Sequence, residues 1–520
     1  MRKAYFSPGV GWGVPSAPAL ALLAACAVAL AGCGGKSEAA KEAGSDSTGL
    51  PLDDRLHVPL VANRTIAPAL GLQVASAAVA VSVPGHRTSE FTVARDPTNP
   101  YHLVAAGMDW DSPDGTVQCA AFVSRDGGGS WTAAQALPGH VGTSEDTDPW
   151  VAIDAKGVTY LTCTEAGTGL LLGKSLDGGA TWQPAQVVPT GGTAAKDALG
   201  AFGDGQLYLC YQTSVLHVLI SKDGGGAWND AGFGQIPAGC NGVVQGPGGE
   251  VYVVWQGAAT IEADRLTPGP PSLGIVLTRD GGAHWEDLTL SSDTGAAPQN
   301  LPAAPQSAAP SLAVSSVTGA VFVAAQRYQN AEVVGPLGSA THADGLLFRS
   351  RDHGRTFQGL ALPAFPSEAC AACNLVHPTL AVDDGGRLVL QATLSSDDST
   401  QKEVWLAVSG DEGATWLAPV QLAGTGPDAS YASPGNFLPD PARVAQDAQD
   451  IAKDPGHAPA AAQALATHQT WPVFHRDGGE YYGITTLPGA ALGLWVQHAP
   501  DGRNAILARP VSILSPKATP

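Results

Sequence analysis

In this 520-residue chain, several segments in which apolar and polar residues alternate begin with an acidic side chain. Glu90, Asp148 and Asp197 each open such a segment. Two carboxylates can act as acid and as nucleophile or base in the hydrolysis of a glycosidic bond. Carboxylate oxygens are also the ligands that Ca²⁺ prefers. Glu90 with Asp148 is one candidate catalytic pair, and Asp109 with Asp197 is another.

Other polar and aromatic residues hold positions from which they would meet the same ligand. Asn241, His377 and Trp471 open further alternating segments, and Arg327 and Tyr328 begin a connection after another one. Side chains in such a column can bind a polar ligand or a cation such as Ca²⁺. They can equally hold water and bond to neighbouring segments without any further function. All three interpretations fit the residue types.

A second acidic group lies in the string MDWDSPDG, which contains Asp109, Asp111 and Asp114. Three aspartates at short spacing are typical of oxygen-ligand loops that bind calcium. The spacing is not that of an EF-hand loop, so these residues are only a candidate metal site.

The alternating segments belong to a repeat that ends in a Gly-rich turn. Its strings are SRDGGGSW, SLDGGATW, SKDGGGAW, TRDGGAHW, SRDHGRTF and SGDEGATW, with aspartates at Asp126, Asp177, Asp223, Asp280, Asp352 and Asp411. In a tight turn, Asp accepts hydrogen bonds from nearby backbone N–H groups and Gly supplies a positive φ. These aspartates are therefore expected to be structural.

The repeated string resembles the Asp-box, S-x-D-x-G-x-T-W, of the sialidase-type (BNR) β-propeller superfamily. The resemblance implies an all-β propeller of four-stranded blades. Six of the alternating strand pairs lead to such a box, and a seventh, from Trp471, leads to Pro500-Asp501-Gly502, which we interpret as a decayed box. The spacing predicts seven blades, with six as the alternative.

The propeller is expected to span residues 61–516, with a closing strand from about Leu60 to Val83 and a partly helical insertion at about 424–469. The first strand of each blade lines the central channel in a propeller. The column of polar residues should therefore ring the mouth of the channel, on the face opposite the Asp-boxes. Function on this fold is expected on that face.

Composition agrees with a turn-rich β protein. The chain has 64 Gly and 40 Pro, about one residue in five, which argues against long helices. Its formal net charge of −20 argues against nucleic acid as a partner, because phosphate binding needs a basic face.

The N-terminus has the pattern of an export signal. Arg2 and Lys3 precede an apolar run at 19–30 that ends in the string LAGC. The string resembles the lipobox of bacterial lipoproteins, which implies a signal peptide at 1–32 and acylation of Cys33. Gly34 after the cysteine implies the outer membrane or cell surface, with residues 33–60 as a flexible tether. The lipid would make the membrane a partner of this protein.

Six cysteines follow Cys33, an even number that suggests disulfides in an exported protein. The pairs expected are Cys119–Cys163, Cys210–Cys240 and Cys370–Cys373, of which the first two would link adjacent blades. A redox CxxC motif, or a zinc site with His377, is the alternative for the last pair.

Sialidase activity does not fit the residues at the channel. Sialidases of this superfamily hold the substrate carboxylate with three arginines, the first in an R-I-P motif at the first inner strand. Here that position reads Ser89-Glu90-Phe91, and R-I-P occurs nowhere in the chain. We therefore expect a lipid-anchored, non-catalytic propeller that binds a glycan, a protein or a metal. The alternative is a glycoside hydrolase that uses paired carboxylates.

Overall fold

The computed structural model describes one compact unit of strands and turns within 49–520. The described residues are 71–514 except 76, 110, 112–116, 135–136, 138–145, 166–168, 191–193, 214, 232–237, 258–259, 263–264, 268–271, 293–309, 330–331, 335–336, 340–341, 368–372, 396–401, 425–480 and 499–503. The expected signal peptide, Cys33, the tether and nearly all of 424–469 lie outside them. Within the described ranges, no helix is long and apolar enough to cross a membrane.

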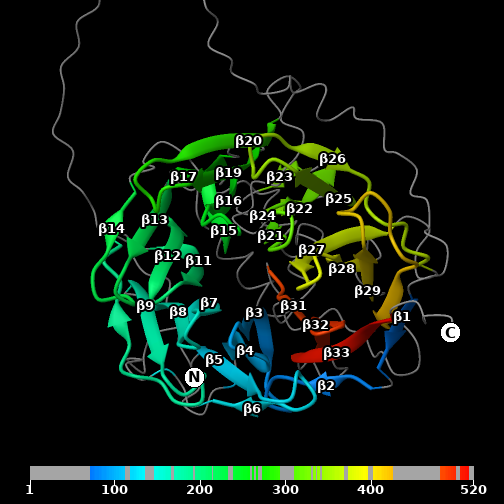
Figure 1. The fold of residues 1–520 in the computed structure, drawn as a ribbon, viewed down its shortest axis with the longest axis horizontal. Coiled ribbons are helices and arrows are strands. Elements are labelled where there is room, and N and C mark those ends of the chain that lie inside the picture. The colour runs from blue at the N-terminus through cyan, green and yellow to red at the C-terminus, as the bar shows by residue number, and fades with distance from the viewer. Residues whose placement is uncertain are drawn as a thin grey trace, which may run out of the picture. The chain divides into compact units, whose positions relative to one another are not determined.

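Seven antiparallel blades of four main strands surround a central channel (Figure 1), as the sequence predicts. Blade 1 contains β3 (Thr88–Asp96), β4 (Asn99–Asp109), β5 (Gln118–Ser124) and β6 (Thr132–Ala133). Blade 2 contains β7 (Asp146–Ile153), β8 (Thr159–Glu165), β9 (Gly169–Ser175) and β10 (Gln186–Val187). Blade 3 contains β11 (Ala195–Phe202), β12 (Gln206–Gln212), β13 (Leu216–Ser221) and β14 (Asn229–Asp230).

Blades 4 and 5 each carry an additional hairpin between their second and third main strands. Blade 4 contains β15 (Ala238–Gln245), β16 (Val251–Gly257), β19 (Ser272–Thr278) and β20 (Glu286–Ser292), with the hairpin β17 (Thr260–Glu262) and β18 (Arg265–Thr267). Blade 5 contains β21 (Ser311–Val314), β22 (Val321–Gln329), β25 (His342–Ser350) and β26 (Gln358–Leu360), with the hairpin β23 (Glu332–Val334) and β24 (Leu337–Ser339). Blade 6 contains β27 (Asn374–Val382), β28 (Leu388–Ser395), β29 (Lys402–Ser409) and β30 (Val420–Ala423).

Blade 7 joins the two ends of the described chain. Its strands β31 (Ile484–Leu487), β32 (Ala490–His498) and β33 (Asn504–Leu514) come from the C-terminal part. Its outer strand β1 (Gly71–Val74) comes from the N-terminal part and pairs with β33, which also pairs with β2 (Val79–Ala80). The expected closing strand is therefore present, and Figure 1 shows it beside the red C-terminal strands.

Two details predicted for blade 7 are wrong. Its inner strand begins at Ile484 rather than at Trp471, which lies outside the described residues. Pro500-Asp501-Gly502 joins β32 to β33, the second strand to the third, whereas Asp-boxes join the third to the fourth. Because β1 supplies the fourth strand from the other end of the chain, blade 7 has no such turn and needs no box.

The six Asp-box turns carry the hydrogen bonds that the motif predicts. In the first box, Asp126 Oδ1 accepts hydrogen bonds from Ser124 Oγ at 2.8 Å and from the Ser130 backbone N–H at 2.9 Å. Ser124 Oγ in turn accepts the Gly128 N–H at 2.8 Å. The aspartates of the other five boxes accept equivalent bonds within their own turns.

The core lies between blades, because each sheet buries both faces against its neighbours. In β28 and β29 every residue is buried. Two disulfides join neighbouring blades, Cys119–Cys163 between blades 1 and 2 and Cys210–Cys240 between blades 3 and 4, and both pairings are as predicted. Disulfides between strands are typical of proteins in oxidising compartments. Cys373 is also disulfide-bonded, and Cys370 lies outside the described residues.

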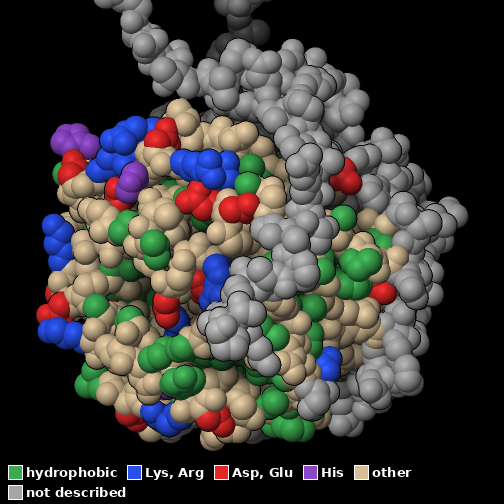
Figure 2. All heavy atoms as spheres, turned by 45° about the vertical axis from the view of Figure 1, so that its right-hand side comes forward, with side chains coloured by type: hydrophobic (Ala, Val, Ile, Leu, Met, Phe, Trp, Pro, Cys, Tyr) green, Lys and Arg blue, Asp and Glu red, His purple; other side chains and the backbone are tan. Residues whose placement is uncertain are grey.

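The outer surface is mixed in charge. Acidic and basic side chains lie side by side on the face drawn in Figure 2, and the apolar side chains there form several separate groups. Five large hydrophobic residues of the described part are exposed, and they belong to different blades or turns: Tyr101, Leu176, Val187, Val317 and Leu514. The exposed side chains therefore do not form a candidate binding site on this surface.

Candidate functional site

The predicted polar column coincides with irregularities in the inner strands. The pairing of first and second strands shifts register at Ser89/Phe91, Thr147/Trp150, Ala195/Ala198, Cys240/Gly242 and Val376/Thr379. Glu90, Asp148, Asp197, Asn241 and His377 lie inside these five shifts. A β-bulge turns its side chain away from the regular alternation of a strand and is common beside binding and active sites. The sequence found this column without predicting the bulges.

Three members of the column have a left-handed backbone. The φ angles of Glu90, Asp148 and His377 are 44°, 54° and 50°. This conformation costs about 1–3 kcal/mol for a residue other than glycine, and such strain clusters at functional sites. The other two described non-glycine residues with positive φ, His353 and Glu412, lie in Asp-box turns.

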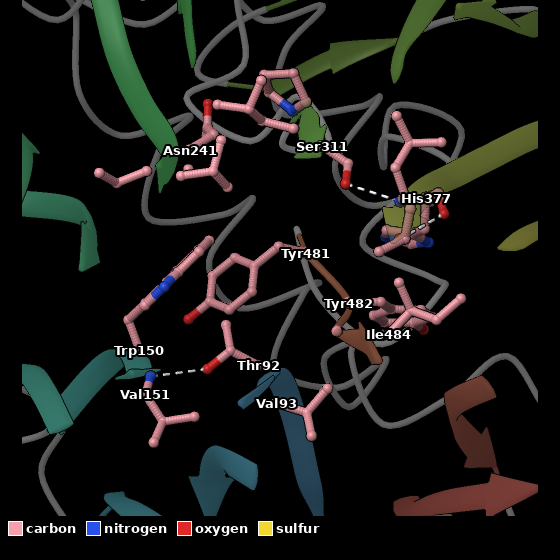
Figure 3. A pocket seen from close by; sticks show the side chains of 18 residues that line it. Thr92, Val93, Trp150, Val151, Asn241, Ser311, His377, Tyr481, Tyr482 and Ile484 are labelled. Atoms are coloured by element: carbon pink, nitrogen blue, oxygen red, sulfur yellow. Dashed lines mark hydrogen bonds between the residues drawn. The ribbon is translucent and has the colours of Figure 1, made fainter. Parts of the chain in front are cut away.

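A cavity of about 250 Å³ occupies the channel between the inner strands. Its lining combines aromatic rings with short polar side chains: Thr92, Val93, Trp150, Val151, Asn241, Gly242, Val243, Val244, Pro310, Ser311, Leu312, His377, Thr379, Leu380, Tyr481, Tyr482, Gly483 and Ile484. Figure 3 shows Trp150 and His377 on opposite sides of this cavity, with Tyr481 beside Trp150. Apolar walls with a few polar groups are typical of small-molecule sites.

Residues 481–483, which we call the crossing segment, line the cavity and directly precede β31 of blade 7. The Tyr481 hydroxyl donates to the Pro149 carbonyl oxygen at 3.3 Å, and the Tyr481 ring lies 5.7 Å from that of Trp150. These contacts join blade 7 to blade 2, across blade 1. Tyr481 and Trp150 together form an aromatic corner beside the cavity.

Tyr482, the second tyrosine of the crossing segment, is stacked against two other rings. Its ring stacks on His377 at a centroid distance of 4.1 Å and on Phe91 at 5.0 Å. Gly483 then lies so close to β3 that a Cβ there would come 2.7 Å from the Val93 backbone nitrogen. The segment is thus packed against blades 1, 2 and 6, and Tyr482 fixes the ring of His377.

Asp197 is the deeply buried member of the column, with a relative exposure of 3%. Burial raises the pKa of its carboxyl well above the usual value, and the negative charge of Asp148 adds to the rise. Thr164 Oγ1 donates to Asp197 Oδ1 at 3.4 Å, whereas Oδ2 has no hydrogen-bond partner among the described residues. Burial of Asp197 therefore disfavours the charged form of its carboxyl.

The candidate calcium residues Asp109 and Asp111 bind basic side chains of their own chain. Arg87 Nη2 and Nε donate to Asp111 Oδ1 at 2.7 and 3.1 Å, and the Arg87 backbone N–H donates to Oδ2 at 2.8 Å. His86 Nδ1 lies 2.8 Å from Asp109 Oδ2. A cation here would have to displace Arg87, and the described residues contain no group of three or more metal-ligating side chains. Asp114 lies outside the described residues.

The structure places the remaining candidate site residues on their strands, although the side chains of some of them are not described. Glu90 and Asp148 lie on adjacent inner strands, whereas Asp109 and Asp197 are on blades 1 and 3 with blade 2 between them. Arg327 and Tyr328 still belong to β22, opposite Asp344 and Ala343, rather than to the following connection. Of these two residues only the backbone is described.

The sequence missed the aromatic corner. Trp150 follows Asp148 by two residues, and this spacing indicates an aromatic ring at the channel mouth. Tyr481 and Tyr482 lie within the strand pair predicted from Trp471, whereas the observed pair begins at Ile484, thirteen residues later. Their position depends on the path of the crossing segment, which no repeat encodes.

Comparison with known proteins finds only distant structural likenesses. No known sequence family and no curated protein matches the chain. A protein of unknown function from Dyadobacter fermentans DSM 18053 is 14% identical, with a TM-score of 0.42, over 86% of this chain and 100% of its own. YCF48 from Cyanidioschyzon merolae is 11% identical, with a TM-score of 0.41, over 85% of this chain and 100% of its own. The Hadza microbial sialidase Hz136 is 13% identical, with a TM-score of 0.38, over 84% of this chain and 66% of its own.

Likenesses of this strength carry no conclusion about function. The seven four-stranded blades and the six bonded Asp-box turns are properties of this chain itself. By its fold the chain is a sialidase-like Asp-box β-propeller.

Proposed function

We propose that this protein binds a saccharide in the channel mouth, on the face opposite its Asp-boxes, without cleaving it. The observation that carries the proposal is the aromatic corner of Trp150 and Tyr481 beside a cavity with the polar groups of Asn241 and Ser311. A sugar ring offers C–H faces to an aromatic ring and hydroxyls to short polar side chains. The volume of about 250 Å³ lies just below the roughly 300–1,000 Å³ of sites for drug-sized ligands, which suits one or two sugar units.

Strain at the rim supports a binding role. Glu90, Asp148 and His377 keep a costly backbone conformation in the inner strands around this cavity, and strain of this kind clusters at functional sites. The Arg87 guanidinium near the mouth is held by Asp111, and no Arg or Lys is found in the described lining. Among the described lining residues, the clamp of arginines that sialidases use for a carboxylate therefore has no counterpart, while Arg476 and the side chain of Arg327 lie outside the described part.

A glycoside hydrolase is the second candidate, favoured by one observation. Burial raises the pKa of the Asp197 carboxyl well above that of an ordinary aspartate, and the negative charge of Asp148 adds to the rise. Acid and base roles in hydrolases rest on such a difference in pKa. Release of reducing sugar by the wild-type protein, lost in Asp148→Asn, would establish catalysis and contradict the non-catalytic role.

The binding proposal is tested with a glycan array followed by calorimetric titration of each hit. We expect Trp150→Ala to weaken binding at least tenfold, because it removes the stacking surface, while the fold is kept. Tyr101→Ala, a change at an exposed aromatic residue outside the cavity, is the matched control and should leave affinity unchanged. If no saccharide binds, or if Trp150→Ala binds like the wild type, the proposal fails.

We further propose that the protein is exported and anchored to the cell envelope by lipid on Cys33. The LAGC string and the disulfides between blades support export. Labelled palmitate should enter the wild-type protein and not the Cys33→Ser variant, which should leave the membrane fraction. Equal labelling of both proteins would contradict the anchor.

A further inference from the structure

A second cavity lies between blades 1 and 2, on the side of the Asp-boxes, and has a volume of about 310 Å³. Val123 and three alanines form its apolar walls, and one of these alanines, Ala180, belongs to the second Asp-box turn. Arg125, Ser130 and Thr132 supply its polar groups. The cavity shares no described lining residue with the channel cavity, so it is a separate place for a ligand.

Arg125 brings to this cavity a guanidinium that is oriented but not neutralised. Its Nη2 donates to the backbone carbonyl oxygen of Asp177, in the second Asp-box turn, at 2.8 Å. Among the described residues, Arg125 has no other hydrogen bond and no carboxylate partner. A guanidinium has five N–H donors, so most of those of Arg125 remain for a ligand.

Blade 4 contains the same turn with one informative difference. The strings SRDGGGSWT and TRDGGAHWE align without a gap, so Arg279 corresponds to Arg125. Glu286 in turn corresponds to Thr132. The pairing of the third and fourth strands is also the same, because Thr132 and Glu286 each lie opposite the residue directly before the box. The two turns therefore present corresponding side chains in corresponding places.

In blade 4 the arginine has a carboxylate partner. Arg279 Nη2 donates to the carbonyl oxygen of His353 in the next Asp-box turn at 2.8 Å, a contact of the same kind as that of Arg125. Its Nε also donates to Glu286 Oε1 at 3.2 Å, and Glu250 Oε1 lies 3.9 Å from its Nη1. Because blade 1 has a threonine at the position of Glu286, the cavity beside Arg125 lacks that carboxylate.

The remaining walls define the rest of the ligand. Val123 and the alanines offer small apolar surfaces, which suit a compact hydrocarbon group. The Ser130 hydroxyl donates to Asp126 Oδ2 at 2.7 Å, so its proton is not available to a ligand. A volume of about 310 Å³ is at the lower end of the range for small-molecule sites. A planar carboxylate can accept two parallel hydrogen bonds from a guanidinium.

We propose that this cavity binds a small carboxylic acid with a compact hydrocarbon group, whose carboxylate pairs with Arg125 as Glu286 pairs with Arg279. The site lies outside the channel and is independent of saccharide binding there. Binding is reversible and involves no covalent step. The contact of Arg125 with Asp177 fixes the guanidinium before the ligand arrives, which lowers the entropic cost of pairing.

The test is a titration of the purified protein with benzoate and with benzamide, its uncharged analogue, followed by saturation-transfer difference NMR. We expect benzoate to bind at least fivefold more tightly than benzamide, because only benzoate carries the charge that pairs with Arg125. Raising NaCl from 50 to 500 mM should weaken benzoate binding and leave benzamide binding unchanged, since salt screens an exposed ion pair. Equal affinity for the two probes, or no binding of benzoate, overturns the proposal.

Arg125→Gln isolates the guanidinium and should lower the affinity for benzoate at least fivefold, to that for benzamide. Lys222→Gln is the matched control, because Lys222 holds the corresponding position in the third Asp-box, is exposed and lines neither described cavity. It removes the same charge from the protein and should change benzoate affinity less than twofold. Equal loss in both variants would mean that only the overall charge matters, and would overturn the assignment to Arg125.

Thr132→Glu recreates in blade 1 the pair found in blade 4 and provides a test that keeps Arg125. Its carboxylate should pair with Arg125 and lower benzoate affinity at least fivefold. Thr132→Gln adds a side chain of the same size without the charge and should lower benzoate affinity less than Thr132→Glu does. Thr132 is exposed, so both variants should keep the fold, which circular dichroism checks. If Thr132→Glu binds benzoate like the wild type, the cavity does not hold the ligand beside Arg125.

Discussion

Gly483 keeps the crossing segment in place because no side chain fits there. A Cβ at this position would come 2.7 Å from the Val93 nitrogen and 3.0 Å from Thr92 Cα, both of them backbone atoms that cannot rotate away. We predict that Gly483→Ala lowers the free energy of unfolding by about 1–3 kcal/mol and weakens saccharide binding by moving Tyr481. Urea denaturation measures the first effect and titration the second.

The control for that change is Gly71→Ala, whose added Cβ would lie 3.8 Å from Leu514 Cδ1, an ordinary contact. It should change the free energy of unfolding by less than about 0.5 kcal/mol. If both variants behave alike, the close approach of the crossing segment to β3 does not govern its position.

The Asp-box carboxylates make stability depend on acid pH. Hydrogen bonds from the Thr181 hydroxyl and backbone N–H lower the pKa of Asp177 from 3.8 to about 2. The backbone N–H and side chain of His284 do the same for Asp280. A lowered pKa in the folded state adds stability above the unfolded value near 3.8, and this stability is lost as the pH falls from about 4 to about 2.

We therefore predict that the thermal midpoint of the wild-type protein falls between pH 4 and pH 2. The double variant Asp177→Asn, Asp280→Asn should show a shallower fall over the same range, because two of the shifted groups no longer titrate. Thermal melts followed by circular dichroism at several pH values provide the test, and parallel curves for the two proteins would contradict it.

At the scale of elements, the strand β1 closes the ring. Leu72 and Val74 pack against the core shared by blades 6, 7 and 1, while Gln73 between them is exposed. Replacing both apolar residues, Leu72→Asp with Val74→Asp, should cost about 2–3 kcal/mol of unfolding free energy, since each is partly buried. Gln73→Asp adds charge to the same strand without touching the core. Equal urea midpoints for the two variants would show that β1 does not hold blade 7.

The two disulfides between blades act on the unfolded chain. They close loops with sequence separations of 44 and 30 residues, for which the loss of chain entropy predicts about 3–4 kcal/mol each. Replacing Cys119 and Cys163 by Ala together should lower the urea midpoint without changing the saccharide specificity. An unchanged midpoint would indicate that strain in the folded state offsets the entropy.

Over the whole molecule, sequence reasoning succeeded where the chain repeats itself. Six Asp-boxes and the alternation before them identified the blades, because each box requires the same Asp, Gly and aromatic residue in its turn. Blade 7 was misplaced because its outer strand comes from the opposite end of the chain, so that no box marks it. The string at Trp471 resembled another unit, but the paired strands begin at Ile484.

The candidate site was predictable only in part for the same reason. The polar column follows from the alignment of repeats, and five of its members lie in bulges around the channel. The aromatic corner brings together Trp150 and Tyr481, which are far apart in sequence, through a segment that belongs to no repeat. Contacts of this kind depend on the path of the chain through the closed ring, which local patterns do not encode.

If a saccharide occupies the cavity beside Trp150, a crystal structure of the protein soaked with the tightest array hit will show it there. We expect a sugar ring stacked on Trp150 within the cavity of about 250 Å³, with its hydroxyls within hydrogen-bond distance of Asn241 or Ser311. A sugar bound only on the Asp-box face or on the outer strands, with the channel cavity free of it, would show that the cavity is not the binding site.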